Sequence, residues 1–366
     1  EPFAPGKLVD RTTFGVQVGD ASEDTLTALR ELGVGSVRLQ ARWGDVSQTT
    51  QAVTALRGAG YDVLVRLSQP KDAWDDLEAW RAYVRRAFEA MRDEASCFEI
   101  GAAPNRIKWA GYETYHDYAA AARVAGAVAR DIGVHTAGPA TQDFEPYWTA
   151  AALADFAGFD VLSDHLYTDR SGEPENAEEG VFDIVNKMRL FRALAQVYGQ
   201  REFWSTQFNW ILDVPGGEQW AARSSLVDEE RQADYLVRYY VLGLSSGFVE
   251  RMYWFVLRGR LTGLLDDDGS ERPAFEAYRH MTRQLAGATF RGRMESPPWV
   301  YLMSFDKGGR RLVVAWTRDG KRHRARLPAL LVRDRDGAIV AGRRDELEVG
   351  PSPIYVTLGA PACRER

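Results

Sequence analysis

The chain has 366 residues, of which 45% are hydrophobic and 11% aromatic, enough to bury one large core and a smaller second module. Its net charge of -6 argues against a nucleic-acid partner, because phosphate binding requires a clear excess of Lys and Arg on one face. The longest apolar runs are too short to cross a bilayer, so we expect no transmembrane segment.

Short β-branched or apolar runs alternate with helical patterns as far as about residue 285, which is typical of repeated βα units. Strands are predicted at 13–19, 36–41, 62–68, 97–102, 134–140, 159–167, 202–208 and 251–257. Apolar residues at helical spacing predict helices at 22–32, 49–59, 77–92, 112–132, 183–199 and 228–247. Eight strands predict an α/β fold, a (β/α)8 TIM barrel over residues 1–285. A doubly wound sheet would have a Gly-rich phosphate turn after its first strand, and this chain has none.

From about residue 286 the pattern changes to short alternating segments, with Asp319-Gly320 at a hairpin position. We therefore predict a small β-sandwich-like domain over 286–366, which packs on the barrel and could gain a strand from residues 1–12. Its hairpin at 310–326 is rich in arginine. Such a hairpin is either a solvated face that resists edge pairing or a surface for an acidic polysaccharide or lipid head group.

Barrel enzymes carry their chemistry at the C-terminal ends of the strands. The stretch CFEIGAAPNRIKW, residues 97–109, ends the fourth predicted strand, and EFWSTQFNW, residues 202–210, ends the seventh. Both resemble segments of glycoside hydrolase clan A, most strongly the family 39 type of β-xylosidases, α-iduronidases and bacterial exopolysaccharide hydrolases. The family pattern would read FEIGNEPN in the first segment. The resemblance therefore places Ala103 where the general acid/base glutamate stands and Gln207 where the nucleophile stands.

The resemblance covers most of the barrel, because VRLQARWGD, FDVLSDHLYT and MYWFVL match the ends of strands two, six and eight. It implies a sugar cleft in which a histidine and a tyrosine lie near the sugar and a tryptophan forms the floor of the first subsite. The implied ligand-binding positions are Arg38, Trp43, Ala102, Asn105, Trp109, His165, Tyr167, Gln207 and Trp254.

The missing carboxylates determine which chemistry we expect. Retaining hydrolysis needs two carboxyl groups about 5–5.5 Å apart, one to protonate the leaving oxygen and one to attack the anomeric carbon. Ala103 has no proton to transfer, and Gln207 is a neutral and very poor nucleophile. The chain is therefore predicted to be a carbohydrate-binding pseudoenzyme. Two alternatives stay open, an engineered inactive variant of a retaining glycosidase and a scaffold protein in exopolysaccharide or cell-envelope assembly.

Other carboxylates leave a third possibility open. Asp143 and Glu145 follow the fifth predicted strand and Asp164 ends the sixth, so a catalytic pair could have been rebuilt from these loops. Glu99 is different, because strand alternation aims it into the barrel below the cleft. We expect it to be buried and paired with an arginine such as Arg38 or Arg66.

Tryptophans gather at or beyond the predicted strand ends, at positions 43, 109, 148, 204, 210, 220 and 254. Sugar rings stack on aromatic faces, so this distribution suits a carbohydrate cleft. Trp204 is the exception, because it comes early in its strand, where bulky side chains fill the barrel.

Two further expectations concern cofactors and location. Cys97 and Cys363 are the only cysteines, and no Cys/His spacing suggests zinc, so no metal and no cofactor is expected. The chain begins at Glu1 rather than Met, which indicates processing or trimming and favours a secreted, periplasmic or cell-envelope location over a cytoplasmic one.

Overall fold

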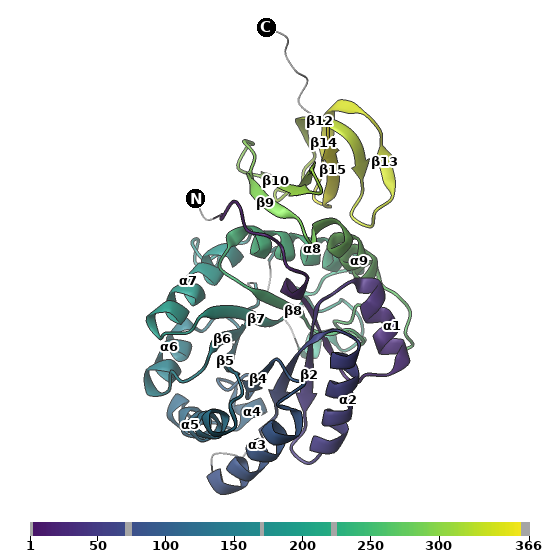
Figure 1. Cartoon of the computed structure of the whole chain (residues 1–366). Helices are drawn as coiled ribbons and strands as arrows, with labels where there is room; N and C mark the ends of the chain where they lie inside the picture. The colour runs from purple at the N-terminus through teal and green to yellow at the C-terminus, as the bar shows by residue number, and fades with distance from the viewer. Residues whose placement is uncertain (1–2, 70–74, 169–171, 221–224, 360–366) are drawn as a thin grey trace.

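The computed structural model describes residues 3–69, 75–168, 172–220 and 225–359. Eight parallel strands close into a barrel in chain order (Figure 1), and the predicted (β/α)8 fold is confirmed. The strands are β1 (Phe14–Val18), β2 (Ser36–Ala41), β3 (Asp62–Leu67), β4 (Cys97–Ile100), β5 (Thr136–Gln142), β6 (Val161–His165), β7 (Glu202–Phe208) and β8 (Arg251–Trp254). Helices surround the barrel: α1 (Glu23–Leu32), α2 (Val46–Gly58), α3 (Leu77–Met91), α4 (Ile107–Ala110), α5 (Tyr115–Ile132), α6 (Pro146–Asp155), α7 (Ile184–Val197), α8 (Glu229–Ser246) and α9 (Pro273–Leu285).

Most of these helices begin with a polar N-cap residue. They begin at the end of the barrel where the strands have their C-termini, and we call this end the mouth. Side chains at the N-caps of α1, α2, α3, α5, α7 and α8 accept a hydrogen bond from the backbone N–H three residues later. Such a cap contributes about 1 kcal/mol. α6 and α9 begin instead with Pro146 and Pro273, whose fixed φ suits the first helical turn. These two helices were not among the predicted ones.

The barrel interior has an apolar lower layer and a polar upper layer. The lower layer is formed by Leu64, Cys97, Ala137, Val161, Trp204 and Tyr253. Trp204 is 4% exposed, so the prediction that it belongs to the core is confirmed. Cys97 is buried and free, whereas Cys363 lies outside the described residues.

The C-terminal domain is a seven-stranded antiparallel sheet in the order β13-β12-β15-β11-β10-β9, with β14 beside β12. Its strands are β9 (Thr289–Arg293), β10 (Val300–Lys307), β11 (Arg310–Thr317), β12 (His323–Arg333), β13 (Ile339–Ala341), β14 (Arg344–Val349) and β15 (Ile354–Leu358). Successive side chains of β10 and β11 point to opposite faces of the sheet and so pack in two different hydrophobic cores. One face of the sheet, including Met303 and Val314, joins the barrel core, and the other, including Leu302 and Val313, packs within the domain.

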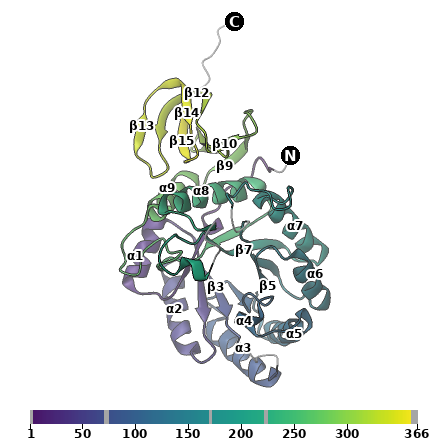
Figure 2. The same cartoon turned by 180° about the vertical axis from the view of Figure 1, so that it is seen from behind.

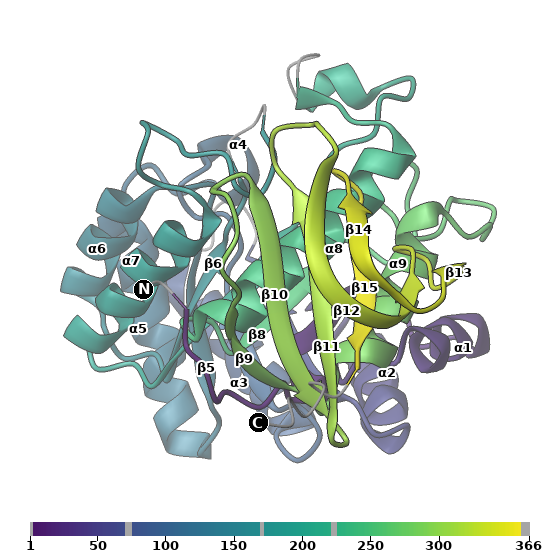
Figure 3. The same ribbon diagram turned by 90° about the horizontal axis from the view of Figure 1, so that it is seen from above.

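The sheet lies over α8 and α9 (Figure 3), so α8 is covered on both sides. Arg335, 5% exposed at its side chain, pairs with Glu230 and Asp234 of α8 at 2.9 and 2.8 Å. The chain near the N-terminus joins the same region (Figures 1 and 2), because the backbone of residues 6–9 exchanges hydrogen bonds with residues 287–290. These contacts hold the two domains together.

Candidate functional site at the barrel mouth

Arg38 of β2 is the centre of a buried polar network in the upper barrel. Its side chain is fully buried, and its Nε donates to Glu99 Oε2 at 2.8 Å. Its Nη1 donates to Gln207 Oε1 at 3.2 Å, and its Nη2 donates to His165 Nε2 at 2.9 Å. The expected buried pair between Glu99 and Arg38 is confirmed. The network joins side chains from β2, β4, β6 and β7 beneath the mouth.

His165 is a structural member of this network. Its Nδ1 donates to Gln142 Oε1 at 3.0 Å while its Nε2 accepts from Arg38, so both ring nitrogens have partners and the ring is 1% exposed. Burial, followed by the positive charges of Arg38 and Arg66, lowers the pKa of His165 well below its usual value. The ring is therefore neutral and holds Arg38 in place. A direct contact with a ligand, as the resemblance implied, does not fit this burial.

Gln207 lies at the top of the network and is 9% exposed. Its amide bridges two groups, because Oε1 accepts from Arg38 and Nε2 donates to Tyr167 Oη at 2.7 Å. Burial raises the pKa of Tyr167, so its phenol stays protonated. The position that the resemblance assigns to a nucleophile thus carries a neutral, hydrogen-bonded amide.

The segment after β4 is braced by its backbone and by one amide. Ala103 is 5% exposed and adopts a positive φ of 48°, and its N–H donates to the carbonyl of Ala140 at 2.9 Å. Asn105 Nδ2 donates to the Gln142 carbonyl at 2.9 Å, and Asn105 Oδ1 accepts from the Gln142 N–H at 2.8 Å. Asn105 therefore fastens this loop to β5, and Ala102 beside it is half-buried.

Two predicted ligand-binding tryptophans pack against other aromatic rings. Trp254 is fully buried, with Phe208 and Trp210 at ring-centroid distances of 5.6 and 6.2 Å. Trp43 stacks on Trp80 at 6.1 Å and lines a groove of about 760 Å³ between α2 and α3. The enclosed ring of Trp254 does not support the sugar contact that the resemblance implied for it, and Trp43 faces the groove between α2 and α3.

Large apolar side chains are exposed on the segments that follow the strand ends. They are Ile107 and Trp109 after β4, Tyr147 after β5, Val181 after β6 and Trp220 after β7. Trp109 is 44% exposed and Trp220 is 60% exposed. Exposed apolar side chains on loops at the C-terminal ends of the strands are candidates for an interaction site. We call these five residues the apolar rim.

The carboxylates that could have rebuilt a catalytic pair do not face one another across the mouth. Asp143 and Glu145 come from one loop and pair with the same atom, Nη2 of Arg106, at 2.5 and 3.7 Å. Asp164 is fully buried, and among the described residues its carboxyl oxygens have no hydrogen-bond partner. His165, the next residue, points into the barrel, so alternation turns Asp164 toward the helices.

The burial of Asp164 predicts a pH-dependent stability. Burial, with a smaller effect of Asp143, raises the pKa of Asp164 well above its usual value. As the pH rises above about 4, the unfolded chain loses this proton while the folded chain keeps it, so stability falls until the folded pKa is passed. We expect Asp164→Asn to be more stable than the native chain at pH 7–8 and to match it near pH 4, because the asparagine has no proton to lose. Urea unfolding across this pH range measures the difference, and a constant difference would contradict the prediction.

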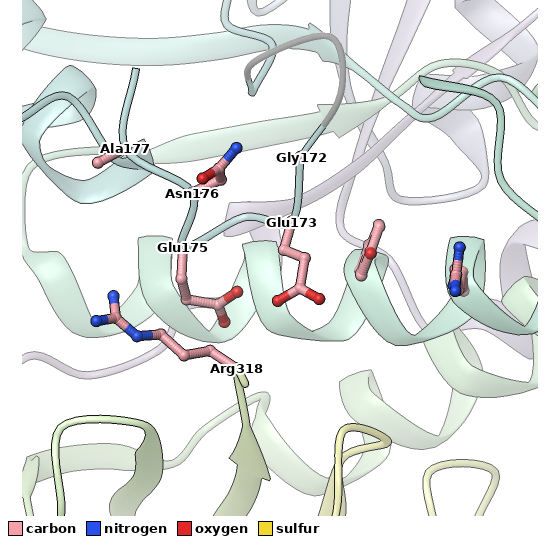
Figure 4. Close-up of a pocket in the computed structure, with 8 residues that line it drawn as sticks. Gly172, Glu173, Glu175, Asn176, Ala177 and Arg318 are labelled. Atoms are coloured by element: carbon pink, nitrogen blue, oxygen red, sulfur yellow. The ribbon is translucent and has the colours of Figure 1, made fainter. Parts of the chain in front are cut away.

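A second groove, of about 630 Å³, lies between the loop after β6, α8 and the β domain. Figure 4 shows Glu173, Glu175 and Arg318 on its walls. Both glutamates pair with the buried Arg238, and Glu175 Oε1 also accepts from Trp316 Nε1 at 2.6 Å. This carboxylate pair was not predicted from the sequence. It ties the loop after β6 to α8 and to the β domain.

Three arginines of the arginine-rich hairpin pair with carboxylates. Arg311 pairs with Asp306 at 3.3 Å, Arg322 with Glu348 at 3.1 Å and Arg324 with Glu346 at 3.6 Å. These exposed cross-strand pairs favour the solvated-face interpretation over an anionic partner at this hairpin.

The described residues offer neither a metal-binding cluster nor a membrane-spanning helix. No group of three or more His, Cys, Asp or Glu side chains there is placed to hold a metal ion. Within the same ranges, no helix has the length and apolar character needed to span a bilayer.

No protein-family model matches the chain, and no curated protein matches it in sequence. Its fold is similar to that of a family 39 glycoside hydrolase from Bacteroides cellulosilyticus WH2, with a TM-score of 0.77, 17% identity and coverage of 96% of this chain and 82% of that one. A GH30 endoxylanase from Clostridium papyrosolvens C71 has a TM-score of 0.66 at 15% identity and 98% coverage of both chains. A family 30 subfamily 8 xylanase from Clostridium acetobutylicum has a TM-score of 0.66 at 14% identity and 97% coverage of both. At these identities the likeness shows a shared fold.

Proposed function

We propose that this protein binds a polysaccharide or oligosaccharide at the barrel mouth and does not hydrolyse it. The observation that carries the proposal is the apolar rim, which places exposed Trp109 and Trp220 beside the mouth of a glycosidase-like barrel. Indole rings bind sugars through stacking on C–H surfaces, and the adjacent polar groups select orientation. The glycoside hydrolases with similar folds support a carbohydrate ligand.

The absence of hydrolysis follows from the side chains at the two positions where the resemblance places catalytic glutamates. A methyl group stands at Ala103, and the Gln207 amide is already shared between Arg38 and Tyr167. An amide can still donate to and accept from a sugar hydroxyl. Asp143 and Glu145, bound to one arginine, supply no carboxylate on the opposite side of the mouth.

A scaffold role is the second candidate, and one surface of the β domain favours it. Leu330, Ile339 and Val340 are 47%, 61% and 55% exposed on β12 and on β13, a strand at the edge of the sheet. An exposed apolar edge can pair with another chain. A scaffold would use this edge and leave the mouth unused.

Binding assays on the intact chain separate the two candidates. We expect oligosaccharide binding in calorimetry to weaken about tenfold in Trp109→Ala and in Trp220→Ala, because each removes a stacking face, and no reducing ends to be released. Trp299→Ala is the matched control, since Trp299 is 41% exposed on the β domain. Equal binding by all variants would contradict the proposal, and so would turnover by the native chain.

A further inference from the structure

A lysine lies between the two exposed tryptophans of the rim. Lys108 Nζ is 5.2 Å from the ring centroid of Trp109 and 6.0 Å from that of Trp220. Trp109 belongs to α4 after β4, whereas Trp220 follows a short helical turn after β7. β4 and β7 are not neighbours in the barrel, so segments from separate sides of the mouth meet at this ammonium group. We call Trp109, Lys108 and Trp220 the Trp–Lys–Trp bridge.

Within the described residues, no carboxylate neutralises the charge of the bridge. Lys108 is exposed, and no carboxylate of the described residues lies within salt-bridge distance of it. Its contacts with the indole faces leave N–H donors available, since a cation–π contact uses the charge without accepting a hydrogen bond. The bridge therefore presents two flat apolar faces around one positive charge.

The floor of the mouth also carries a positively charged side chain. Glu99 neutralises Arg38, but Arg66 beside it on β3 has no carboxylate partner in the part of the chain that the structure describes. Arg66 is half-buried, its Nη2 donates to the neutral Gln40 side chain, and its Nε has no hydrogen-bond partner there. Lys108 at the rim and Arg66 in the floor are thus both without a carboxylate partner among the described residues.

We infer that the ligand is an acidic glycan, whose sugar rings stack on Trp109 and Trp220 while its anionic group binds Lys108. This inference rests on the proposed function. The shared chemistry is a negative charge on a sugar ring, either the carboxylate of a uronic acid or a sulfate ester. An acidic polypeptide carries the charge without the stacking surface of a sugar ring, so the aromatic faces favour the glycan.

Matched glycan pairs test the inference with the full chain, by calorimetry at low and moderate salt. Polygalacturonate is compared with its methyl-esterified form, and dextran sulfate with dextran. We expect the charged member of one pair to bind at least about tenfold more tightly, and its advantage to shrink with added salt because exposed charges are screened. The pair that shows the difference identifies carboxylate or sulfate as the anionic group.

Lys108→Gln is expected to remove most of this advantage and to leave the uncharged glycans unaffected. Lys321→Gln, an exposed lysine in the hairpin of the β domain, is the matched control, and thermal unfolding verifies that both variants are folded. Equal affinity for charged and uncharged glycans, or an unchanged advantage in Lys108→Gln, overturns the inference and leaves the proposed function standing. Tighter binding of polyglutamate than of any glycan, or binding of no glycan, overturns both.

Discussion

Replacing Glu99 by glutamine is expected to lower the free energy of unfolding by about 3–5 kcal/mol, because it leaves the fully buried Arg38 without the carboxylate that pairs with it. The remaining partners of Arg38, among them His165 and Gln207, are neutral, so they accept its hydrogen bonds without compensating its charge. Denaturant unfolding of the native chain and of Glu99→Gln at the same pH measures the difference.

The chain offers a matched exposed pair as the control. Arg324 and Glu346 are 3.6 Å apart with side chains 81% and 50% exposed, so Glu346→Gln should change stability by no more than about 1 kcal/mol. The double variant Arg38→Met/Glu99→Leu should recover part of the loss, because it removes both buried charges together. A loss in Glu99→Gln as small as in Glu346→Gln would mean that water or the loops of the mouth solvate Arg38.

Restoring the residues that the resemblance implies, with Ala102→Asn, Ala103→Glu and Gln207→Glu together, is expected to produce hydrolysis of aryl glycosides that the native chain lacks. The electrostatics at position 207 favour this result. Arg38 already contacts the Gln207 side chain at 3.2 Å, and Arg66 in the floor has no carboxylate partner among the described residues. A carboxylate at 207 would add a negative charge beside these arginines while keeping the shape of the glutamine.

Partial variants separate the two steps of the reaction. General acid catalysis typically contributes about 10²–10⁴-fold, so Gln207→Glu alone should act only on glycosides with good leaving groups, and Ala103→Glu alone should be inactive. A panel of aryl glycosides with leaving groups of different acidity provides the readout. Turnover by the native chain would indicate that Asp143 and Glu145 act as the catalytic carboxylates. A triple variant without activity would favour a mouth that binds glycans without hydrolysis, or the scaffold role.

Local patterns were sufficient to predict most of the architecture. The predicted strands correspond to β1–β8, although the run at 251–257 was longer than β8, which ends at Trp254 because the chain then turns to bond with Gln17 and Leu265. α4, α6 and α9 were missed, and the proline at the first position of α6 and of α9 was the available signal.

The sequence by itself determined the eight-stranded barrel, the burial of Glu99 with Arg38 and of Trp204, and the lack of carboxylates at 103 and 207. These follow from residue identity and from periodicity along the chain, which fix the face that a side chain occupies. Only the tertiary structure decided that Trp254 and His165 are buried and that Lys108 contacts the ring of Trp220. Those outcomes depend on how loops from strands that are not neighbours pack once the barrel closes, and such contacts leave no periodic trace in the sequence.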